Sequence, residues 1–350
     1  MEKAETRVPF GKTGLRLPPI LFGTSCLGNL YQALPWETKL GILRACRTHV
    51  APPVVLDCAG KYGAGLALET IGKGLRELGV QPDQVAISNK LGWLRKPLTT
   101  PEPTFEPGVW AGLEHDAEQA ISYEGILACW RQGCELLGAY RPRLLSVHDP
   151  DEYLGAATTP NERRRRFGDV LAAYRALGEL KTSGEVAAVG VGSKDWTVIR
   201  ELADATRLDW AMLACSLTVY RHPSELLAFV ARLEAAGVAV VNSAVFHAGF
   251  LTGGSFFDYR KVARDTPADR PLFAWRESFH NVCRRHGVDP AQACVRFGMS
   301  VPGVVATALN TSRPDRVEEN VAAVRAEIPA AFWTALKDAG LVARDFPWLG

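Results

Sequence analysis

Eight short runs of aliphatic and β-branched residues recur along this 350-residue chain, and the segments between them carry apolar residues at helical spacing. Because parallel strands must be joined by long crossover connections, usually helices, this alternation is typical of a parallel sheet. Eight such units in a chain of this length fit a closed (β/α)8 barrel better than an open sheet. The runs comprise residues 20–23, 54–57, 85–89, 144–148, 187–192, 210–214, 238–243 and 304–309.

We therefore predict a single α/β domain over residues 1–350 with the architecture of a (β/α)8 TIM barrel. Before the first run, residues 8–17 contain two extended pieces around a Gly-Lys-Thr-Gly turn. This pattern is typical of a β-hairpin, which here would cap one end of the barrel. We expect the hairpin to have a structural role only.

Two stretches interrupt the alternation of strands and helices. Leu91–Tyr123 is rich in Pro, Thr and Trp, and Phe246–Pro271 is rich in Gly and aromatic residues. Long loops after barrel strands often control access to a site, although a disordered excursion is the alternative. We favour the functional interpretation because Trp93 and Trp110 are costly to leave exposed.

The composition argues against several classes of protein. The net charge is +2, which predicts no nucleic-acid partner. The one basic block, residues 163–166, opens an amphipathic pattern and is expected to be a solvated helix face. The eight cysteines have no CxxC spacing, which is typical of reduced thiols. Without an apolar leader or a stretch of ~18 apolar residues, we expect a cytoplasmic protein that spans no membrane.

Polar residues stand at the ends of three consecutive runs. Asp57 ends the second run and Tyr62 follows it, Lys90 follows the third, and His148 ends the fourth. The carboxyl ends of barrel strands meet at one rim, where barrel enzymes carry out their chemistry. An ammonium favours the ionised form of a nearby phenol, and a carboxylate holds the ammonium. Each residue alone has a structural explanation, but together they predict a proton-transfer site for interconverting an alcohol and a carbonyl.

Three segments resemble a known family. They are Asp57-Cys-Ala-Gly-Lys-Tyr62-Gly, Ile87-Ser-Asn-Lys90 and Val147-His148-Asp-Pro-Asp151. In this order they are similar to the catalytic segments of the aldo-keto reductase superfamily. The similarity extends from Phe10-Gly-Lys-Thr-Gly-Leu through Gly190-Val-Gly to Arg316-Val-Glu-Glu-Asn320. The branch that looks most similar is that of the aldose 1-dehydrogenases, including L-fucose and D-threo-aldose dehydrogenases, through Phe22-Gly-Thr-Ser-Cys-Leu-Gly-Asn-Leu-Tyr31 and Ser122-Tyr-Glu-Gly-Ile126.

The resemblance implies an NAD(P)-dependent oxidoreductase and a role for each of the four polar residues. Tyr62 would transfer the proton, as a base when a hydroxyl is oxidised and as an acid when a carbonyl is reduced. Lys90 would lower the pKa of Tyr62, and Asp57 would hold the Lys90 ammonium. His148 would hydrogen-bond the reacting oxygen, while hydride passes directly between substrate and nicotinamide.

The chain contains neither GxGxxG at the start of a helix nor GxxxxGK[ST], so a dinucleotide would have to bind without these fingerprints. The resemblance implies that it lies across the barrel rim, and a helix N-terminus near Ser312 would supply amides suited to phosphate. The implied cofactor-binding residues are Gly192, Ser193, Ser243, Ala244, Val245, Phe246, Gly249, Leu251, Asn310, Thr311, Ser312, Arg316, Glu319 and Asn320.

Departures from the family pattern affect individual cofactor contacts. Gly192-Ser193 stands where many members have Ser-Asn for the nicotinamide carboxamide, and Asn242 stands where many have a ring-stacking tyrosine. Asn310 replaces a lysine common in phosphate-preferring members, while Arg316 is retained. The site therefore has one basic group fewer to bind the 2′-phosphate that distinguishes NADP from NAD. This slightly favours NAD.

The resulting expectation is an aldose 1-dehydrogenase that oxidises the C1 hydroxyl of a small neutral sugar to a lactone. The alternatives are an NADPH-dependent reductase of aldehydes or ketones, and a non-catalytic, cofactor-binding regulatory barrel. Candidate substrate contacts are Tyr31, Trp93, Trp110 and His247, with packing roles as the alternative. No HExxH or other recognisable metal pattern is present, so we expect no catalytic metal.

Overall fold

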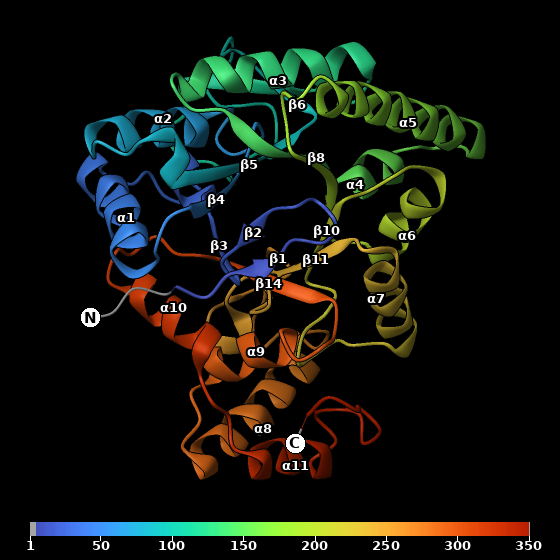
Figure 1. The fold of residues 1–350 in the computed structure, drawn as a ribbon. Coiled ribbons are helices and arrows are strands. Elements are labelled where there is room, and N and C mark those ends of the chain that lie inside the picture. The colour runs from blue at the N-terminus through green and yellow to red at the C-terminus, as the bar shows by residue number, and fades with distance from the viewer. Residues whose placement is uncertain (1–4, 350) are drawn as a thin grey trace.

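The computed structural model describes residues 5–349, and its centre is a closed barrel of eight parallel strands (Figure 1). The strands are β3 (Ile20–Gly23), β4 (Val54–Ala59), β5 (Val85–Leu91), β8 (Pro142–His148), β9 (Ala188–Ser193), β10 (Trp210–Ala214), β11 (Ala239–Ser243) and β14 (Val304–Asn310). They are neighbours in this order, and β14 pairs with β3 to close the barrel. Each of the eight predicted runs is one of these strands, so the predicted fold is confirmed.

Helices connect the strands and surround the barrel on its outside (Figure 1). The α-helices are α1 (Trp36–His49), α2 (Leu66–Glu77), α3 (Tyr123–Leu137), α4 (Pro150–Gly155), α5 (Pro160–Thr182), α6 (Trp196–Ala205), α7 (Ser224–Ala236), α8 (Arg270–His286), α9 (Pro290–Gly298), α10 (Arg316–Arg325) and α11 (Ala330–Asp338). Short 3-10 turns are η1 (Ser25–Gly28), η2 (Pro82–Gln84) and η3 (Phe250–Thr252). Among residues 5–349, no helix combines the length and apolar character that crossing a bilayer requires.

Local sequence signals explain where several helices begin. Ser122 accepts a hydrogen bond from the Gly125 amide at the start of α3. Asp289 does the same for two amides at the start of α9, with Pro290 as the first helical residue. Such caps satisfy amides that have no partner within the helix.

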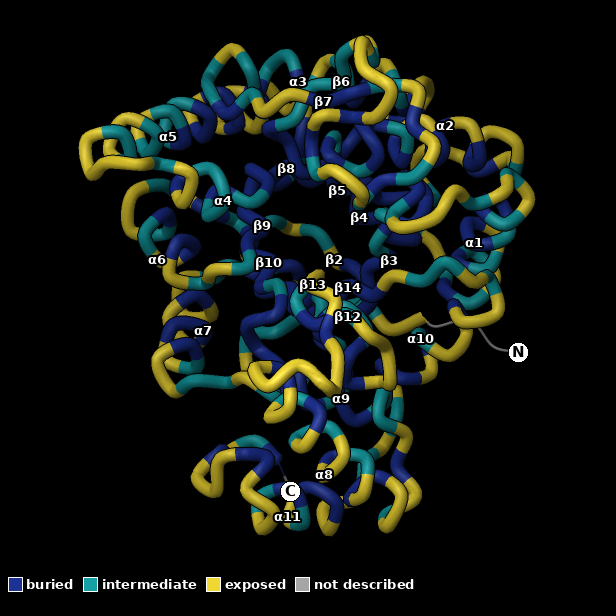
Figure 2. The backbone as a smooth tube through the Cα atoms, turned by 180° about the vertical axis from the view of Figure 1, so that it is seen from behind, coloured by how far each residue is buried: buried dark blue, intermediate teal, exposed yellow. Residues whose placement is uncertain are grey.

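Helices cover the outside of the barrel, and side chains fill its inside. The strands β4 and β5 are therefore buried along their whole length. Figure 2 shows this buried centre, with the exposed residues on the outer helices and loops. All eight cysteines are buried and free, as predicted.

The predicted amino-terminal hairpin is present and packs on the barrel core. β1 (Val8–Pro9) pairs antiparallel with β2 (Arg16–Leu17). Phe10 is fully buried, with its ring centroid 6.2 Å from that of Trp210. Gly11 has a φ of +56°, and a Cβ there would lie 2.5 Å from the Gly237 carbonyl oxygen. Only glycine fits this turn without strain.

The two interrupting stretches are largely ordered rather than disordered excursions. In the first, β6 (Trp93–Pro97) pairs antiparallel with β7 (His115–Gln119). In the second, β12 (Phe256–Phe257) pairs antiparallel with β13 (Arg260–Lys261). An isolated bridge between Leu30 and Trp110 ties the first stretch to the segment that follows β3.

Candidate active site

The carboxyl ends of β4 and β5 hold a buried ion pair. The Lys90 ammonium donates to the Asp57 carboxylate at 2.5 Å and to the Cys58 carbonyl oxygen at 3.2 Å. Each of the two charged side chains is about 3–4% exposed. Two opposite charges taken out of water are tolerated only when they are paired and hydrogen-bonded. The predicted Asp57–Lys90 contact is therefore present.

Tyr62 and His148 complete the group that the sequence predicts. The Lys90 ammonium lies 4.8 Å from the centroid of the Tyr62 ring, and the His148 ring lies edge-on to it at 5.6 Å. The turn that carries Tyr62 is held against η1, since a Cβ on Gly63 would lie 2.2 Å from the Gly28 carbonyl oxygen. Tyr62 is partly exposed, whereas the other three residues are buried. Tyr62 is thus the least buried member of the group.

The pKa of Tyr62 is raised well above 10, first by burial and then by the Asp57 and Asp149 carboxylates. This direction is opposite to the lowering expected from Lys90. Burial in a low-dielectric site penalises the phenolate, and here that penalty outweighs the nearby ammonium. Tyr62 is therefore a protonated phenol at neutral pH, ready to act as a proton donor.

His148 is neutral at pH 7. Burial lowers its pKa well below 6.5, and the ammonium groups of Lys90 and Lys61 lower it further. Its Nδ1 is buried and has no hydrogen-bond partner within residues 5–349, and its Nε2 lies 3.6 Å from Asp149 Oδ2. A neutral imidazole carries one N–H that can donate to a substrate oxygen.

A second group of charges, which the sequence analysis missed, surrounds Lys61. Lys61 is buried beside Tyr62, and its ammonium lies 2.7 Å from Glu106, 2.8 Å from Glu152 and 3.5 Å from Asp149. Lys194 also pairs with Glu152 and lies 3.9 Å from Asp149. Burial acts to lower the pKa of Lys61, but the three carboxylates outweigh it and the pKa is raised. We call these five residues, Lys61, Glu106, Asp149, Glu152 and Lys194, the rim cluster.

Aromatic side chains from the first interrupting stretch form a wall beside Tyr62. The centroid of the Trp110 ring lies 5.9 Å from that of Tyr62, and Phe105 packs between Trp110 and Trp93 at 6.4 and 5.8 Å. The Trp110 Nε1 donates to Glu106 at 2.8 Å, which links this wall to the rim cluster. Two of the four predicted substrate contacts, Trp93 and Trp110, therefore lie next to the tetrad of Asp57, Tyr62, Lys90 and His148.

The other two predicted substrate contacts differ from each other. Tyr31 is 41% exposed and stacks on Phe256 at 4.9 Å, so it lies where the two interrupting stretches approach each other. His247 is fully buried, with Nε2 at 2.7 Å from Thr218 Oγ1 and Nδ1 at 2.6 Å from Asp258 Oδ1. With both ring nitrogens taken, His247 does not belong with the substrate contacts.

Two predicted cofactor contacts form part of the barrel wall. Gly192 lies against Lys90, because a Cβ there would be 3.2 Å from the Lys90 side chain. The Ser193 hydroxyl donates to the Asp195 carbonyl oxygen.

Asn242 is fully buried and donates to the carbonyl oxygens of Leu217 and Gly298. Asn242 thus braces the barrel and presents no surface to a ring.

The segment after β11 forms a backbone cradle suited to an anion. Ala244, His247, Ala248 and Gly249 all have positive φ, between 49° and 88°. Within residues 5–349, the amides of Ala248 and Gly249 donate to no protein acceptor. Backbone amides that converge in such left-handed turns bind phosphate and carboxylate groups. The other predicted residues of this segment, Ser243, Val245, Phe246 and Leu251, adjoin it.

A second polar region follows β14. The side-chain amide of Asn310 donates to Ser25 at 2.7 Å. Thr311 and Ser312 follow Asn310 in the chain. The next helix, α10, begins at Arg316, four residues after Ser312, near which the helix start was predicted. Arg316 is exposed and lies 3.6 Å from Glu319. The Asn320 Nδ2 is buried without a hydrogen-bond partner in the described part of the chain, which leaves a donor for a ligand.

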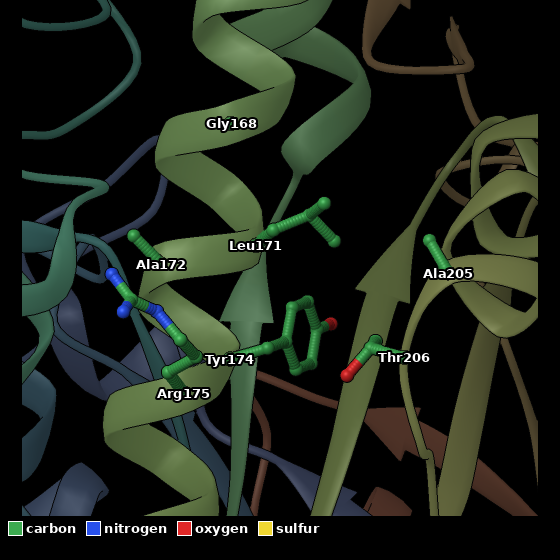
Figure 3. Close-up of a pocket in the computed structure, with 7 residues that line it drawn as sticks. All are labelled: Gly168, Leu171, Ala172, Tyr174, Arg175, Ala205 and Thr206. Atoms are coloured by element: carbon green, nitrogen blue, oxygen red, sulfur yellow. The ribbon is translucent and has the colours of Figure 1, made fainter.

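The pocket drawn in Figure 3 is separate from this site. It has a volume of about 430 Å³ and lies between α5 and the end of α6, on the outer helical layer. Leu171 and Tyr174 point towards Ala205 and Thr206, and Arg175 points away. No charged group is directed into it, so it offers none of the chemistry that the tetrad offers.

A model of the Aldo/keto reductase family matches residues 19–340. The chain belongs to this family. A pyridoxal 4-dehydrogenase of Microbacterium luteolum is 27% identical over 354 aligned residues, covering 97% of this chain and 99% of the relative. A D-threo-aldose 1-dehydrogenase of a Pseudomonas species is 27% identical over 342, covering 94% and 96%. The structure of the glycerol dehydrogenase of Gluconobacter oxydans has the same fold, with a TM-score of 0.71 at 16% identity, covering 97% of this chain and 96% of that one.

This aldo-keto reductase is an NAD(P)-dependent oxidoreductase, and the resemblance found in its sequence is confirmed. The rim fits a nicotinamide dinucleotide on two observations. Within residues 5–349, the backbone amides of Ala248 and Gly249 have no protein acceptor and are free to donate to a phosphate, and the buried side-chain amide of Asn320 also lacks a partner. When bound, the cofactor supplies the hydride acceptor or donor, while the protein supplies the proton and the binding contacts.

Proposed function

We propose that this aldo-keto reductase is an aldose 1-dehydrogenase, which oxidises the C1 hydroxyl of a neutral sugar to a lactone. The observation that supports it most is the tetrad, in which Tyr62 is the one partly exposed residue. An aldose exists largely as a cyclic hemiacetal, and loss of hydride from its C1 gives the lactone directly. The similarity to a D-threo-aldose 1-dehydrogenase over 94% of the chain supports the same reaction.

The residues divide the work between proton transfer and orientation. In this reaction the proton of the sugar C1 hydroxyl passes to the phenolate form of Tyr62, which burial makes scarce at neutral pH and the nearby Lys90 ammonium favours. Asp57 keeps Lys90 in place. The neutral His148 donates a hydrogen bond to the same sugar oxygen, which holds its C–H bond in position for transfer.

The charge of the rim cluster supports a neutral substrate. Lys61 and Lys194 contribute two positive charges, and Glu106, Asp149 and Glu152 contribute three negative ones, which leaves a net charge of −1. A site of this sign repels an anionic substrate. Its carboxylates accept hydrogen bonds, which sugar hydroxyls can donate. The flat face of Trp110 suits the C–H surface of a pyranose.

The aromatic wall supports a second candidate substrate. Pyridoxal also closes to a cyclic hemiacetal, and its ring could pack on Trp110 and Phe105. A pyridoxal 4-dehydrogenase is among the relatives, with 27% identity over 97% of this chain. Either substrate would undergo oxidation of a hemiacetal to a lactone by the same four residues.

For the cofactor we infer a preference for NAD over NADP. Arg316 is the retained basic residue, but it is 54% exposed and lies 3.6 Å from the Glu319 carboxylate. The side chain of Asn310 is already hydrogen-bonded to Ser25. The 2′-phosphate of NADP would therefore lie near Arg316, whose charge is partly neutralised by Glu319, and near the Glu319 carboxylate itself. It would not have two free basic groups to bind it.

The test is reduction of NAD and NADP, in parallel, by the purified protein. The panel contains L-fucose, D-arabinose, L-galactose, D-galactose, pyridoxal and simple alcohols, and oxidation of NADPH is measured separately with simple aldehydes. We expect NADH to form with at least one sugar, and this activity to be absent from Tyr62→Phe. Turnover only of aldehydes with NADPH would favour a carbonyl reductase instead. Cofactor binding without turnover of any substrate or aldehyde would favour a non-catalytic barrel.

A further inference from the structure

Three potential metal ligands meet outside the tetrad, each from a different segment. Cys215 directly follows β10, His247 follows β11, and Asp258 lies in the turn between β12 and β13. The thiol sulfur, an imidazole nitrogen and a carboxylate oxygen lie within 4.8 Å of one another. In residues 5–349 this is the one group of three or more such donors at that spacing.

The three donor types select a class of ion. Sulfur, imidazole nitrogen and carboxylate oxygen together are the ligands of zinc and similar transition metals, whereas calcium and magnesium take oxygen ligands. One thiolate and one carboxylate supply two negative charges, which a divalent ion neutralises. We propose that Cys215, His247 and Asp258 bind a divalent transition-metal ion such as Zn²⁺.

The residues behind the ligands are already arranged to support coordination. Thr218 Oγ1 lies 2.7 Å from His247 Nε2. In the metal-free protein Nδ1–H donates to the Asp258 carboxylate and the Thr218 hydroxyl donates to Nε2, and the same hydroxyl can accept an Nε2–H once Nδ1 binds an ion. Arg221 lies 3.3 Å from Asp258 Oδ2, which leaves Oδ1 facing the histidine. Partners of this kind fix the tautomer and orientation of metal ligands.

Coordination requires only a small rearrangement. His247 Nδ1 and Asp258 Oδ1 are 2.6 Å apart, as in a direct hydrogen bond, whereas two ligands of tetrahedral zinc are about 3.4 Å apart. The ion would replace the hydrogen bond and move these atoms apart by less than about 1 Å. Asp258 and Arg221 are 28% and 45% exposed, so an ion can reach the buried thiol and imidazole past them.

Binding also requires protons to move. The Cys215 thiol is buried beside Asp258. It loses its proton to solvent as the sulfur–metal bond forms, and no oxidant or reductant takes part. The proton that His247 Nδ1 donates to Asp258 moves to Nε2, where Thr218 Oγ1 can accept it, and Nδ1 is then free to bind the ion.

We expect the ion to have a structural rather than a catalytic role, because none of its ligands belongs to the tetrad. Cys215 and His247 follow neighbouring barrel strands, and His247 adjoins the Ala248–Gly249 cradle proposed for phosphate. Asp258 joins these strands to the β12–β13 hairpin. A bound ion would fix the hairpin to the barrel and so hold the cradle in one conformation.

The test is titration of the reduced, metal-free protein with Co²⁺, which reports a sulfur ligand by a thiolate-to-cobalt charge-transfer band. We expect one ion per chain and its displacement by Zn²⁺. The band should be absent from Cys215→Ser and present in Cys129→Ser, which removes a thiol that is equally buried in α3.

Two further variants separate coordination from a simple hydrogen-bond network. Asp258→Asn should bind Co²⁺ more weakly, and Thr218→Val should keep the band while weakening binding about 10- to 100-fold. No charge-transfer band with the folded wild-type protein, or a band that persists in Cys215→Ser, would overturn the proposal. If Cys215→Ser does not fold, the charge-transfer band of the wild-type protein and the weaker Co²⁺ binding of Thr218→Val still test whether the three residues bind a metal ion.

Discussion

Two ionic groups of the same site are built in different ways. The Asp57–Lys90 pair has matched charges, is 3–4% exposed and is held by adjacent barrel strands. The rim cluster has five charges that do not balance, and its Glu106 and Glu152 side chains are 30% and 35% exposed. The buried pair has no access to other hydrogen-bond partners. The partly exposed carboxylates of the rim cluster can exchange a hydrogen bond within the cluster for one to a bound molecule. This difference fits the proposed roles, in which the pair supports proton transfer by Tyr62 and the cluster contacts the substrate.

The largest expected effect comes from breaking the sealed pair. Lys90→Met leaves the Asp57 carboxylate buried without its partner, and we expect this to lower the free energy of unfolding by about 3–5 kcal/mol. Lys61→Met should cost less, because the carboxylates around Lys61 are partly hydrated and Lys194 remains. Urea denaturation followed by circular dichroism measures both.

A double variant provides the control for this prediction. Asp57→Asn with Lys90→Met removes the orphaned charge, so it should be more stable than Lys90→Met alone. If the double variant were no more stable, an unpaired buried carboxylate would not be the cause. If Lys61→Met destabilised the protein as much as Lys90→Met, the distinction between the two groups would fail.

The next effect concerns turnover rather than stability. Tyr62→Phe removes the only hydroxyl of the tetrad, and we expect kcat to fall at least ~100-fold because proton transfer is lost. The free energy of unfolding should change little, since the ring remains packed against Trp110. Tyr123→Phe, at a half-buried tyrosine in the first turn of α3 whose hydroxyl donates to Glu179, is the matched control and should retain full activity. A Tyr62→Phe enzyme with wild-type kcat would remove Tyr62 from the mechanism.

A smaller effect is expected for the rim cluster. Glu106→Ala removes the carboxylate that contacts both Lys61 and the Trp110 indole. We expect a loss of about 1 kcal/mol in binding, a roughly fivefold rise in KM, with kcat nearly unchanged. Glu102→Ala, exposed in the same stretch, should leave KM unchanged. A fall in kcat with constant KM would instead place Glu106 with the chemistry.

The sequence is a good guide to the barrel and the tetrad because both follow from strand topology. Once Val54–Ala59, Val85–Leu91 and Pro142–His148 are neighbouring parallel strands, their carboxyl ends must converge. Contacts made by the loops are different. Lys61 meets Glu106 only because the β6–β7 hairpin folds back over the rim, and no local pattern predicts the conformation of that hairpin.

The same reason explains two expectations that did not hold. The pKa of Tyr62 depends on how deeply the loops bury its hydroxyl, so the nearby Lys90 alone indicates the wrong direction. His247 was expected to face the substrate because it lies in a long loop. It is instead enclosed by Thr218, Asp258 and the stacked ring of Phe257, which come from other segments.

The last expected effect is on the pH dependence of stability, and it isolates His148 from the carboxylates of the rim. The folded protein holds the pKa of His148 well below 6.5, so the unfolded chain binds a proton there that the folded protein does not. The contribution of His148 to stability is therefore present above pH ~6.5 and is lost as the pH falls below it, by up to about 1.4 kcal/mol per pH unit. His148→Gln cannot take up this proton, so its unfolding free energy should fall less steeply between pH 6.5 and 5 than that of the wild type. Equal slopes in urea titrations of the two proteins would mean that folding does not lower the pKa of His148, and the imidazole would then take up a proton in the folded protein over this pH range.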